Sequence, residues 1–221
     1  MIDVSLVLLK HRRILLDELI GLTGLNREVL LGKLKKIKEY VRIDDDEVVI
    51  VKPLDLAIHL LKQGLSVKEI SRYIDWSDFE KVSAEILNAH KYFVKTNFRL
   101  TKPVKLEIDV IGVDPRSGRG LFIDCKHWSR GIHRSALVEI VDKHVNRIEK
   151  FIKYYRWARD KWVYFKYLRE IIPVIITLTT PSLRYYKNTL IVSIQEFNQV
   201  LLDLYTVLDL FNIEPYRLDV K

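Results

Sequence analysis

Hydrophobic residues recur three and four positions apart near the start of the chain, which is the spacing of a helix with one buried face. This pattern predicts a short helix over 14–21 and, after the N-cap residue Asn26, a second helix that ends near Tyr40. The residues expected to be buried in the second helix are Leu30, Leu31, Leu34 and Ile37.

The pattern then changes to that of two short strands, 41–43 and 47–51, on either side of three consecutive aspartates at 44–46. The order helix, turn, helix and hairpin resembles a winged helix, a module that can place its second helix in the major groove of DNA. The basic residues available to phosphates there are Arg27, Lys33, Lys35, Lys36 and Lys38. The aspartates of the hairpin would repel phosphates, so DNA binding and protein binding both stay open for this module.

The remainder of the chain has the element order of an α/β domain. The pattern predicts a helix over 78–90, strands at 92–99, 105–113 and 121–127, a long helix from 135 toward 162, strands at 172–179 and 190–194, and a helix over 195–210. The expected fold is therefore α/β, with a mixed sheet covered by helices on two faces. We expect a winged-helix-like domain over 1–53, a helical connection over 54–74 and the α/β domain over 75–221.

The composition excludes several classes of protein. Of the 221 residues, 48% are hydrophobic and 30% are charged, which suits a folded core. No apolar run approaches the ~18 residues of a membrane span, and the first basic residues, Lys10, Arg12 and Arg13, follow the apolar N-terminal stretch, the reverse of a signal peptide. The single cysteine, Cys125, excludes internal disulfides and multi-cysteine zinc sites. We expect a cytoplasmic protein with no membrane contact, and the net charge of +8 favours nucleic acid as partner.

Two acidic residues occupy facing positions of a predicted hairpin. Side chains alternate along a strand, so Asp124 and Lys126 share one face of theirs. A turn centred between Arg116 and Ser117 would place Asp109 directly opposite Asp124. The hairpin therefore predicts a pair of neighbouring carboxylates with a lysine beside them.

Facing carboxylates repel each other unless a cation lies between them. Mg²⁺, or Mn²⁺ in its place, suits this position because it binds few carboxylates and keeps waters, one of which can attack a phosphodiester. Lys126 would orient that water or stabilise the developing negative charge. The alternative is an ordinary ion pair between Lys126 and Asp124 in a hairpin of shifted register.

The same residues resemble the motif of a known superfamily. Asp109 followed by Asp124-Cys125-Lys126, after a helix that contains 79–87, is similar to the PD-(D/E)xK nucleases, which have the restriction-endonuclease-like fold. The similarity covers about residues 75–210. Within the superfamily, the chain most resembles archaeal Holliday junction resolvases and Mrr-type restriction endonucleases. It implies a catalytic set of Glu80, Asp109, Asp124 and Lys126, in which the first three bind the metal.

Further residues bear on this resemblance. Cys125-Lys126-His127-Trp128 and the strand that ends in threonines at 175–181 are similar to Mrr-type enzymes. Ile108 departs from the pattern, since the superfamily often has proline there. Glu85 competes with Glu80 for the helix position, and residues five apart on a helix point in different directions.

The resemblance implies a Mg²⁺-dependent DNA endonuclease, and by analogy with the family a homodimer, because cleavage of two strands needs two sites. Lys143, Arg147 and Lys150 form a basic stripe on the long helix that would follow a phosphate backbone, unless it is only a solvated face. The residues expected to contact nucleic acid are these three together with His127, Arg130 and Arg134. A non-catalytic DNA-binding or regulatory protein of the same fold, or a nuclease acting on RNA, are the alternatives.

Overall fold

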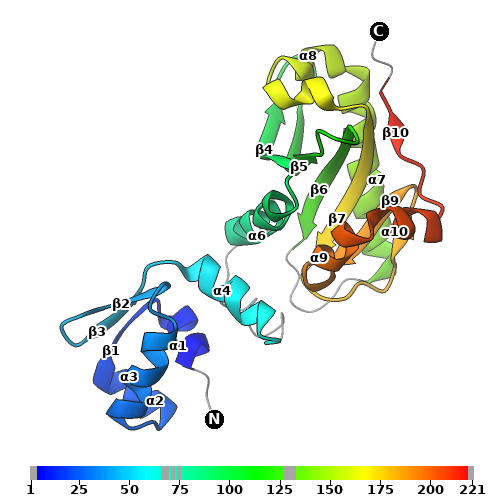
Figure 1. Cartoon of the computed structure of the whole chain (residues 1–221). Helices are drawn as coiled ribbons and strands as arrows, with labels where there is room; N and C mark the ends of the chain where they lie inside the picture. Colours follow the sequence, from blue (N-terminus) through cyan, green and yellow to red (C-terminus); the bar gives the residue numbers. More distant parts are fainter. Residues whose placement is uncertain (1–3, 66–69, 71–72, 74–75, 127–132, 219–221) are drawn as a thin grey trace. The chain divides into compact units, whose positions relative to one another are not determined.

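The computed structural model describes residues 4–65, 70, 73, 76–126 and 133–218 (Figure 1). The chain divides into two compact units, Met1–Asp78 and Phe79–Lys221, which are described separately. No helix of the described residues is both long and apolar enough to cross a lipid bilayer.

The described residues of the first unit form helices and a small antiparallel sheet. The helices are α1 (Val4–His11), α2 (Leu16–Thr23), α3 (Arg27–Lys36) and α4 (Pro53–Lys62). The sheet has the strand order β1 (Arg13–Leu15), β3 (Glu47–Ile50) and β2 (Val41–Asp44). The predicted hairpin is therefore present, and it has a third strand that the hydrophobic pattern did not indicate.

The helices of the first unit differ from the prediction in position. The helix predicted from residue 14 begins at Leu16, because the three residues before it pair with β3 as β1. Asn26 caps α3 as predicted, and its side chain accepts a hydrogen bond of 2.8 Å from the backbone N–H of Val29. Leu31 was predicted to be buried but is 38% exposed, and α3 ends at Lys36 rather than near Tyr40.

The segment expected to be a connection belongs to the core of the first unit. On α4, Leu56, Ala57 and Leu60 are almost fully buried, and they pack in one cluster with Leu8 of α1. Ile70 joins the same cluster. Burial of these apolar side chains stabilises the unit, so α4 is a structural part of it and not a spacer.

The second unit is a mixed α/β domain. Its strands are β4 (Phe93–Leu100), β5 (Leu106–Val113), β6 (Arg119–Lys126), β7 (Glu170–Thr177), β8 (Tyr185–Tyr186), β9 (Thr189–Ser193) and β10 (Tyr216–Arg217). Their order in the sheet is β4-β5-β6-β7-β9-β8, with β10 paired to β7. The pairs β6·β7 and β7·β9 are parallel, and the others are antiparallel. The expected mixed sheet is thus confirmed.

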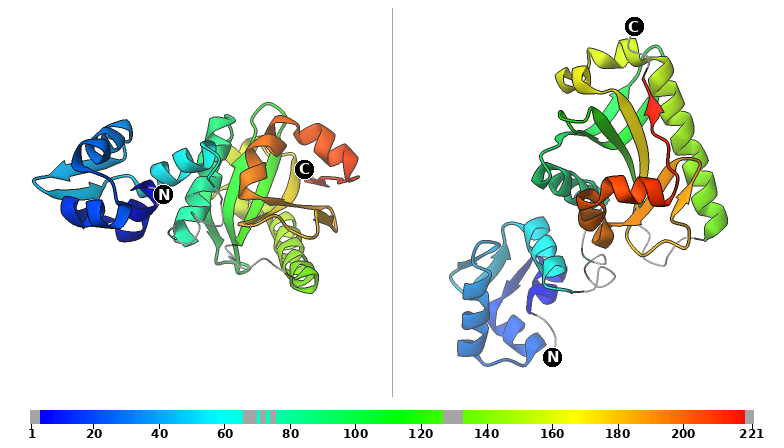
Figure 2. Two further views of the ribbon diagram at one scale, coloured as in Figure 1. Left: turned by 90° about the horizontal axis from the view of Figure 1, so that it is seen from below. Right: turned by 45° about the vertical axis from the view of Figure 1, so that its right-hand side comes forward.

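Helices lie on both sides of this sheet, with α6 (Trp76–Ala89) and α7 (Arg134–Lys153) on opposite sides (Figure 2). The remaining helices are α8 (Tyr155–Arg159), the 3-10 helix η1 (Val163–Tyr167), α9 (Ile194–Leu202) and α10 (Leu204–Leu210). The long helix predicted toward residue 162 therefore ends at Lys153. Cys125 of β6 is fully buried, with its sulfur 3.6 Å from the Ser83 hydroxyl of α6, as a small interior residue.

The turn between β5 and β6 sets the register of the central hairpin. Asp114 accepts hydrogen bonds from Ser117 through its side chain, and Gly118 adopts φ +75° to close the turn. The resulting pairs run from Val113↔Gly120 to Val110↔Ile123, which is the predicted register. Pairing stops before Asp109 and Asp124, so the two strands separate where these acids lie.

Replacing Gly118 by Ala should destabilise the second unit by about 1–3 kcal/mol, since φ is positive and the new Cβ would approach a backbone oxygen. That Cβ would lie 3.0 Å from the carbonyl oxygen of Tyr167 and 2.6 Å from Cγ of Arg169. The measurement is urea unfolding followed by tryptophan fluorescence. The control Arg116→Ala, at an exposed position of the same turn, should change stability by less than about 0.5 kcal/mol. Equal effects of the two substitutions would contradict this role of Gly118.

Candidate functional site

Asp124, near the end of β6, is a buried carboxylate held between two cations. It is 1% exposed, and Lys126 Nζ lies 2.7 Å from its Oδ2. Arg147 of α7 donates a hydrogen bond of 2.8 Å from Nη1 to Oδ1. Burial alone would raise the pKa of Asp124, but the positive charges of His144 when protonated, Lys126 and Arg147 lower that pKa below its ordinary value. Asp124 is therefore ionised at neutral pH, with both oxygens engaged by the protein.

The pKa of Asp109, on β5, is shifted in the opposite direction. Burial and the negative charge of Asp124 raise the pKa of Asp109 to about 6. The backbone N–H of Cys125 donates a hydrogen bond of 2.8 Å to its Oδ2, which offsets part of this effect. The two predicted carboxylates are thus close enough to repel each other, and the proton affinity of Asp109 reflects that repulsion.

Glu80 is the acid of α6 that faces this cluster. It is 7% exposed, and its charge contributes to the raised pKa values of both Asp109 and Cys125. Glu85, the competing residue of the same helix, is exposed. The structure therefore brings together all four residues that the resemblance implies, Glu80, Asp109, Asp124 and Lys126, in one electrostatic cluster.

His144 of α7, which the sequence pattern does not single out as a site residue, lies next to the same cluster. The ring is fully buried, and Nε2 donates a hydrogen bond of 2.8 Å to the carbonyl oxygen of Phe122. Its Nδ1 atom has no hydrogen-bond partner in the described part of the chain. Burial lowers the pKa of His144 to about 4, so the ring is neutral at pH 7. Its place three residues before Arg147, in register with the buried positions Val141 and Ile148, was the available signal.

The residues expected to contact nucleic acid have different surroundings. Arg147 was assigned to a phosphate-binding stripe, but the structure pairs it with Asp124 and makes it part of the cluster. Lys143 is exposed and pairs with Glu139 at 2.5 Å, while Lys150 is exposed. Arg134 is exposed at the start of α7, and the remaining two residues of the prediction, His127 and Arg130, lie outside the described residues.

The cluster suits a hard divalent cation in donor type and charge. Glu80, Asp109 and Asp124 offer only oxygen ligands, which Mg²⁺ prefers, and a cation would relieve the repulsion between the two aspartates. Both oxygens of Asp124 contact protein cations, so a metal would share an oxygen with Lys126 or Arg147, or displace one of them. Within the described ranges, no group of three or more His, Cys, Asp or Glu side chains is already arranged around a common metal position.

Comparisons with known proteins find two proteins that resemble this chain, but neither comparison identifies an activity. No family model matches the chain. An uncharacterized protein of Archaeoglobus fulgidus is 29% identical over 132 residues, which cover 59% of this chain and 92% of that protein. Protein VC1899 from Vibrio cholerae, known from a crystal structure, aligns over 93% of this chain with 13% identity and a TM-score of 0.36. This chain spans about half of that protein, 51% of its length. Neither name states a function, so a function has to be argued from the site.

Replacing Asp109 by Asn should stabilise the second unit above pH 7 when a chelator removes divalent cations. A pKa raised from 3.8 to about 6 means that ionisation of Asp109 costs the folded state free energy above pH 6. Each pKa unit corresponds to about 1.4 kcal/mol, and Asp109 is only partly buried, so we expect a gain of about 1–3 kcal/mol. The gain should disappear as the pH falls from 6 to 4, because the folded wild-type protein then holds the proton.

Urea unfolding at several pH values measures this effect. The matched control is Glu107→Gln on the same strand, an exposed carboxylate that pairs with Arg99 at 2.8 Å. We expect that control to change stability by less than about 1 kcal/mol, because exposed ion pairs contribute little. A less stable Asp109→Asn protein at pH 8 would show that repulsion does not dominate at this position.

Proposed function

We propose that the chain is a metal-dependent endonuclease that hydrolyses phosphodiester bonds of DNA. The observation that carries this proposal is the cluster of Asp109, Asp124 and Lys126 where β5 and β6 separate, with Glu80 contributed by α6. An aspartate whose pKa is raised by burial and by a neighbouring carboxylate, beside a partly buried lysine, is typical of functional sites. Oxygen ligands next to a cationic side chain suit the hydrolysis of a negatively charged substrate.

The arrangement of the second unit supports its assignment to the PD-(D/E)xK superfamily. The order α6, antiparallel β4-β5-β6, α7 and then β7 parallel to β6 matches what the resemblance implies for the restriction-endonuclease-like fold. The acids also lie where that motif requires them, on the second and third strands. Together these features favour a nuclease over an unrelated α/β domain.

The topology of the first unit supports the interpretation that this unit is a winged helix that assists DNA binding. The order α1, β1, α2, α3, β2 and β3, with β3 at the centre of the sheet, agrees with such a module. Arg27 of α3 lies 3.2 Å from Asp46 at the tip of the hairpin, so part of the acidic charge of the wing is neutralised within the unit. This pairing weakens the objection that the wing would repel phosphates.

The residues of the cluster have separable roles in the proposed reaction. Mg²⁺ held by Glu80, Asp109 and Asp124 would supply an activated water and stabilise negative charge on the phosphate. Lys126, with its amino group 2.7 Å from Asp124, orients the attacking water or stabilises the charge that develops on the phosphate oxygens. Arg147 holds the Asp124 carboxylate in place from the side of α7 through its hydrogen bond to Oδ1. A homodimer and a preference for DNA over RNA are part of the same proposal.

One observation favours a second candidate function, a non-catalytic DNA-binding or regulatory protein that retains the fold. Both oxygens of Asp124 are engaged by Lys126 and Arg147, which forms an ion cluster that is complete without a metal. Such a cluster can specify packing between α7 and β6 without chemistry. The two candidates differ in whether divalent cations bind and whether DNA is cut.

Lys126→Ala should abolish cleavage while leaving DNA affinity almost unchanged, because one lysine supplies only a small share of the attraction to phosphates. Asp109→Asn should also abolish cleavage, whereas Glu107→Gln on the same strand should cleave like the wild type. The measurement uses plasmid, branched and single-stranded DNA and an RNA of matched sequence with Mg²⁺ or Mn²⁺. An intact wild-type protein that cuts none of these substrates would favour the non-catalytic candidate.

Arg147→Gln should make stability depend on Mg²⁺. Without metal the variant loses one of the two cations beside the buried Asp124, so we expect a loss of about 1–3 kcal/mol. If the cluster binds Mg²⁺, a concentration about 100 times the dissociation constant should restore about 2.7 kcal/mol. Thermal unfolding with and without Mg²⁺ measures this, with Lys143→Gln on the exposed side of α7 as control. Absence of a Mg²⁺ effect in both wild type and Arg147→Gln would contradict the metal site.

A further inference from the structure

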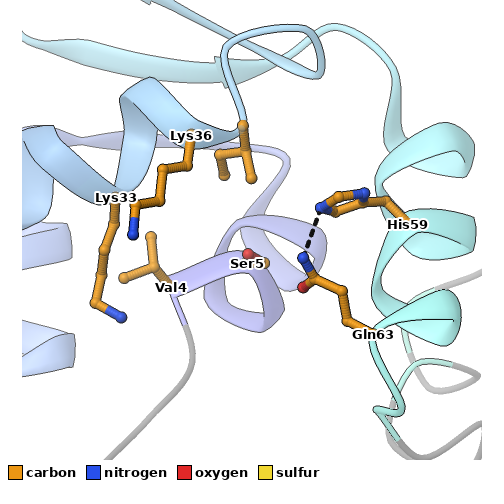
Figure 3. Close-up of a pocket in the computed structure, with 7 residues that line it drawn as sticks. Val4, Ser5, Lys33, Lys36, His59 and Gln63 are labelled. Atoms are coloured by element: carbon orange, nitrogen blue, oxygen red, sulfur yellow. Dashed lines mark hydrogen bonds between the residues drawn. The ribbon is translucent and has the colours of Figure 1, made fainter.

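The first unit contains a pocket of about 280 Å³ among three helices. Its lining residues come from α1, from the end of α3, and from α4 and the residue that follows it: Val4, Ser5, Lys33, Lys36, Ile37, His59 and Gln63. Figure 3 shows Lys33 and Lys36 on one side of the pocket and His59 with Gln63 on the other, with Ser5 between them. The pocket lies entirely within one unit, so its geometry does not depend on the second.

Among the described residues, the charged side chains that line this pocket are the two lysines Lys33 and Lys36. Lys33 and Lys36 are three residues apart on α3, so they extend from the same side of the helix. No salt bridge among the described residues involves either lysine, and none of the described lining residues is acidic. An anion that approaches both ammonium groups would be stabilised by both.

The remaining walls offer hydrogen-bond donors on a packed surface. Ser5, whose side chain bears a hydroxyl, is 8% exposed. The Gln63 side-chain amide donates a hydrogen bond of 2.9 Å to His59 Nε2, which holds both side chains in one orientation. Val4 and Ile37, 4% and 8% exposed, are anchored in the core of the unit. The pocket therefore combines a buried apolar wall with several polar side chains that line the same cavity.

We propose that this pocket binds a terminal phosphate group, that is, a phosphomonoester. A phosphomonoester carries a charge of about −1.5 to −2 at pH 7, which matches the two lysines, and its oxygens accept hydrogen bonds from ammonium and amide donors. The volume is at the lower limit of ligand pockets, which suits one phosphate and the atoms next to it better than a whole nucleotide. An internal phosphodiester continues in two directions and fits an open groove better than a recess.

The same chemistry has two sources, the 5′ end of a nucleic acid strand and a small phosphorylated molecule. In either case Lys33 and Lys36 bind an end group rather than the backbone phosphates of a duplex. The inference does not rest on the proposed nuclease function, because every residue that carries it belongs to the first unit. Loss of cleavage in the second unit and loss of phosphate binding in the first are therefore separate results.

The test compares two double substitutions in the full-length protein that remove equal charge from the first unit. Lys33→Gln with Lys36→Gln changes the pocket, whereas Lys10→Gln with Lys52→Gln changes exposed lysines of the same unit outside it. The probes are inorganic phosphate, adenosine 5′-monophosphate, and one single-stranded oligonucleotide with either a 5′ phosphate or a 5′ hydroxyl. Calorimetry measures the first two, and fluorescence anisotropy at two salt concentrations measures the oligonucleotides.

We expect the pocket variant to lose at least about tenfold in affinity for the phosphate probe that binds, and the control variant to lose less than about twofold. A 5′ phosphate that strengthens oligonucleotide binding only when the pocket is intact identifies a nucleic acid end. Pocket-dependent binding of phosphate or the nucleotide, without an effect of the 5′ phosphate, identifies a small molecule. Equal losses in both double variants, or no binding of any phosphate probe by the wild type, would overturn the proposal.

Discussion

The structure of the second unit depends on one buried charge, the carboxylate of Asp124. An ionised side chain this deeply buried is tolerated only when cations or hydrogen bonds compensate it. Here Lys126 of the same strand and Arg147 of α7 supply that compensation, one at each oxygen. The charge therefore fixes how α7 packs against β6, and at the same time it leaves Asp109 with an elevated proton affinity. Structural and chemical roles of the cluster arise from the same interaction.

The backbone explains why such a cluster forms at this point of the sheet. The turn closed by Gly118 brings β5 and β6 into register, and the pairing ends just before Asp109 and Asp124. Where two strands separate, backbone N–H groups no longer bond across the ladder, and the N–H of Cys125 donates a hydrogen bond to the Asp109 carboxylate instead. The site is thus a consequence of a hairpin that stops pairing at its far end.

The register of this hairpin could be predicted from the sequence because turn chemistry and strand alternation are local properties. Asp114 and Gly118 fix the turn, and side-chain parity then aligns the two acids. The partners of Arg147 could not be predicted, since a basic residue on a helix has the same pattern whether it faces solvent or a buried acid far away in sequence. The burial of His144 likewise depends on which side of α7 meets the sheet. Strand β1 was missed because three residues are too few to show a period.

The place of α4 determines how the chain can be divided into modules. Leu56 and Leu60 are part of the same apolar core as α1, so the cooperative unit at the N-terminus extends well past the hairpin. A fragment that ends at residue 53 would expose the surface that α4 covers, and it would carry an apolar patch open to association. Recombination of this unit onto another protein would therefore have to include α4 for the core of the unit to remain covered.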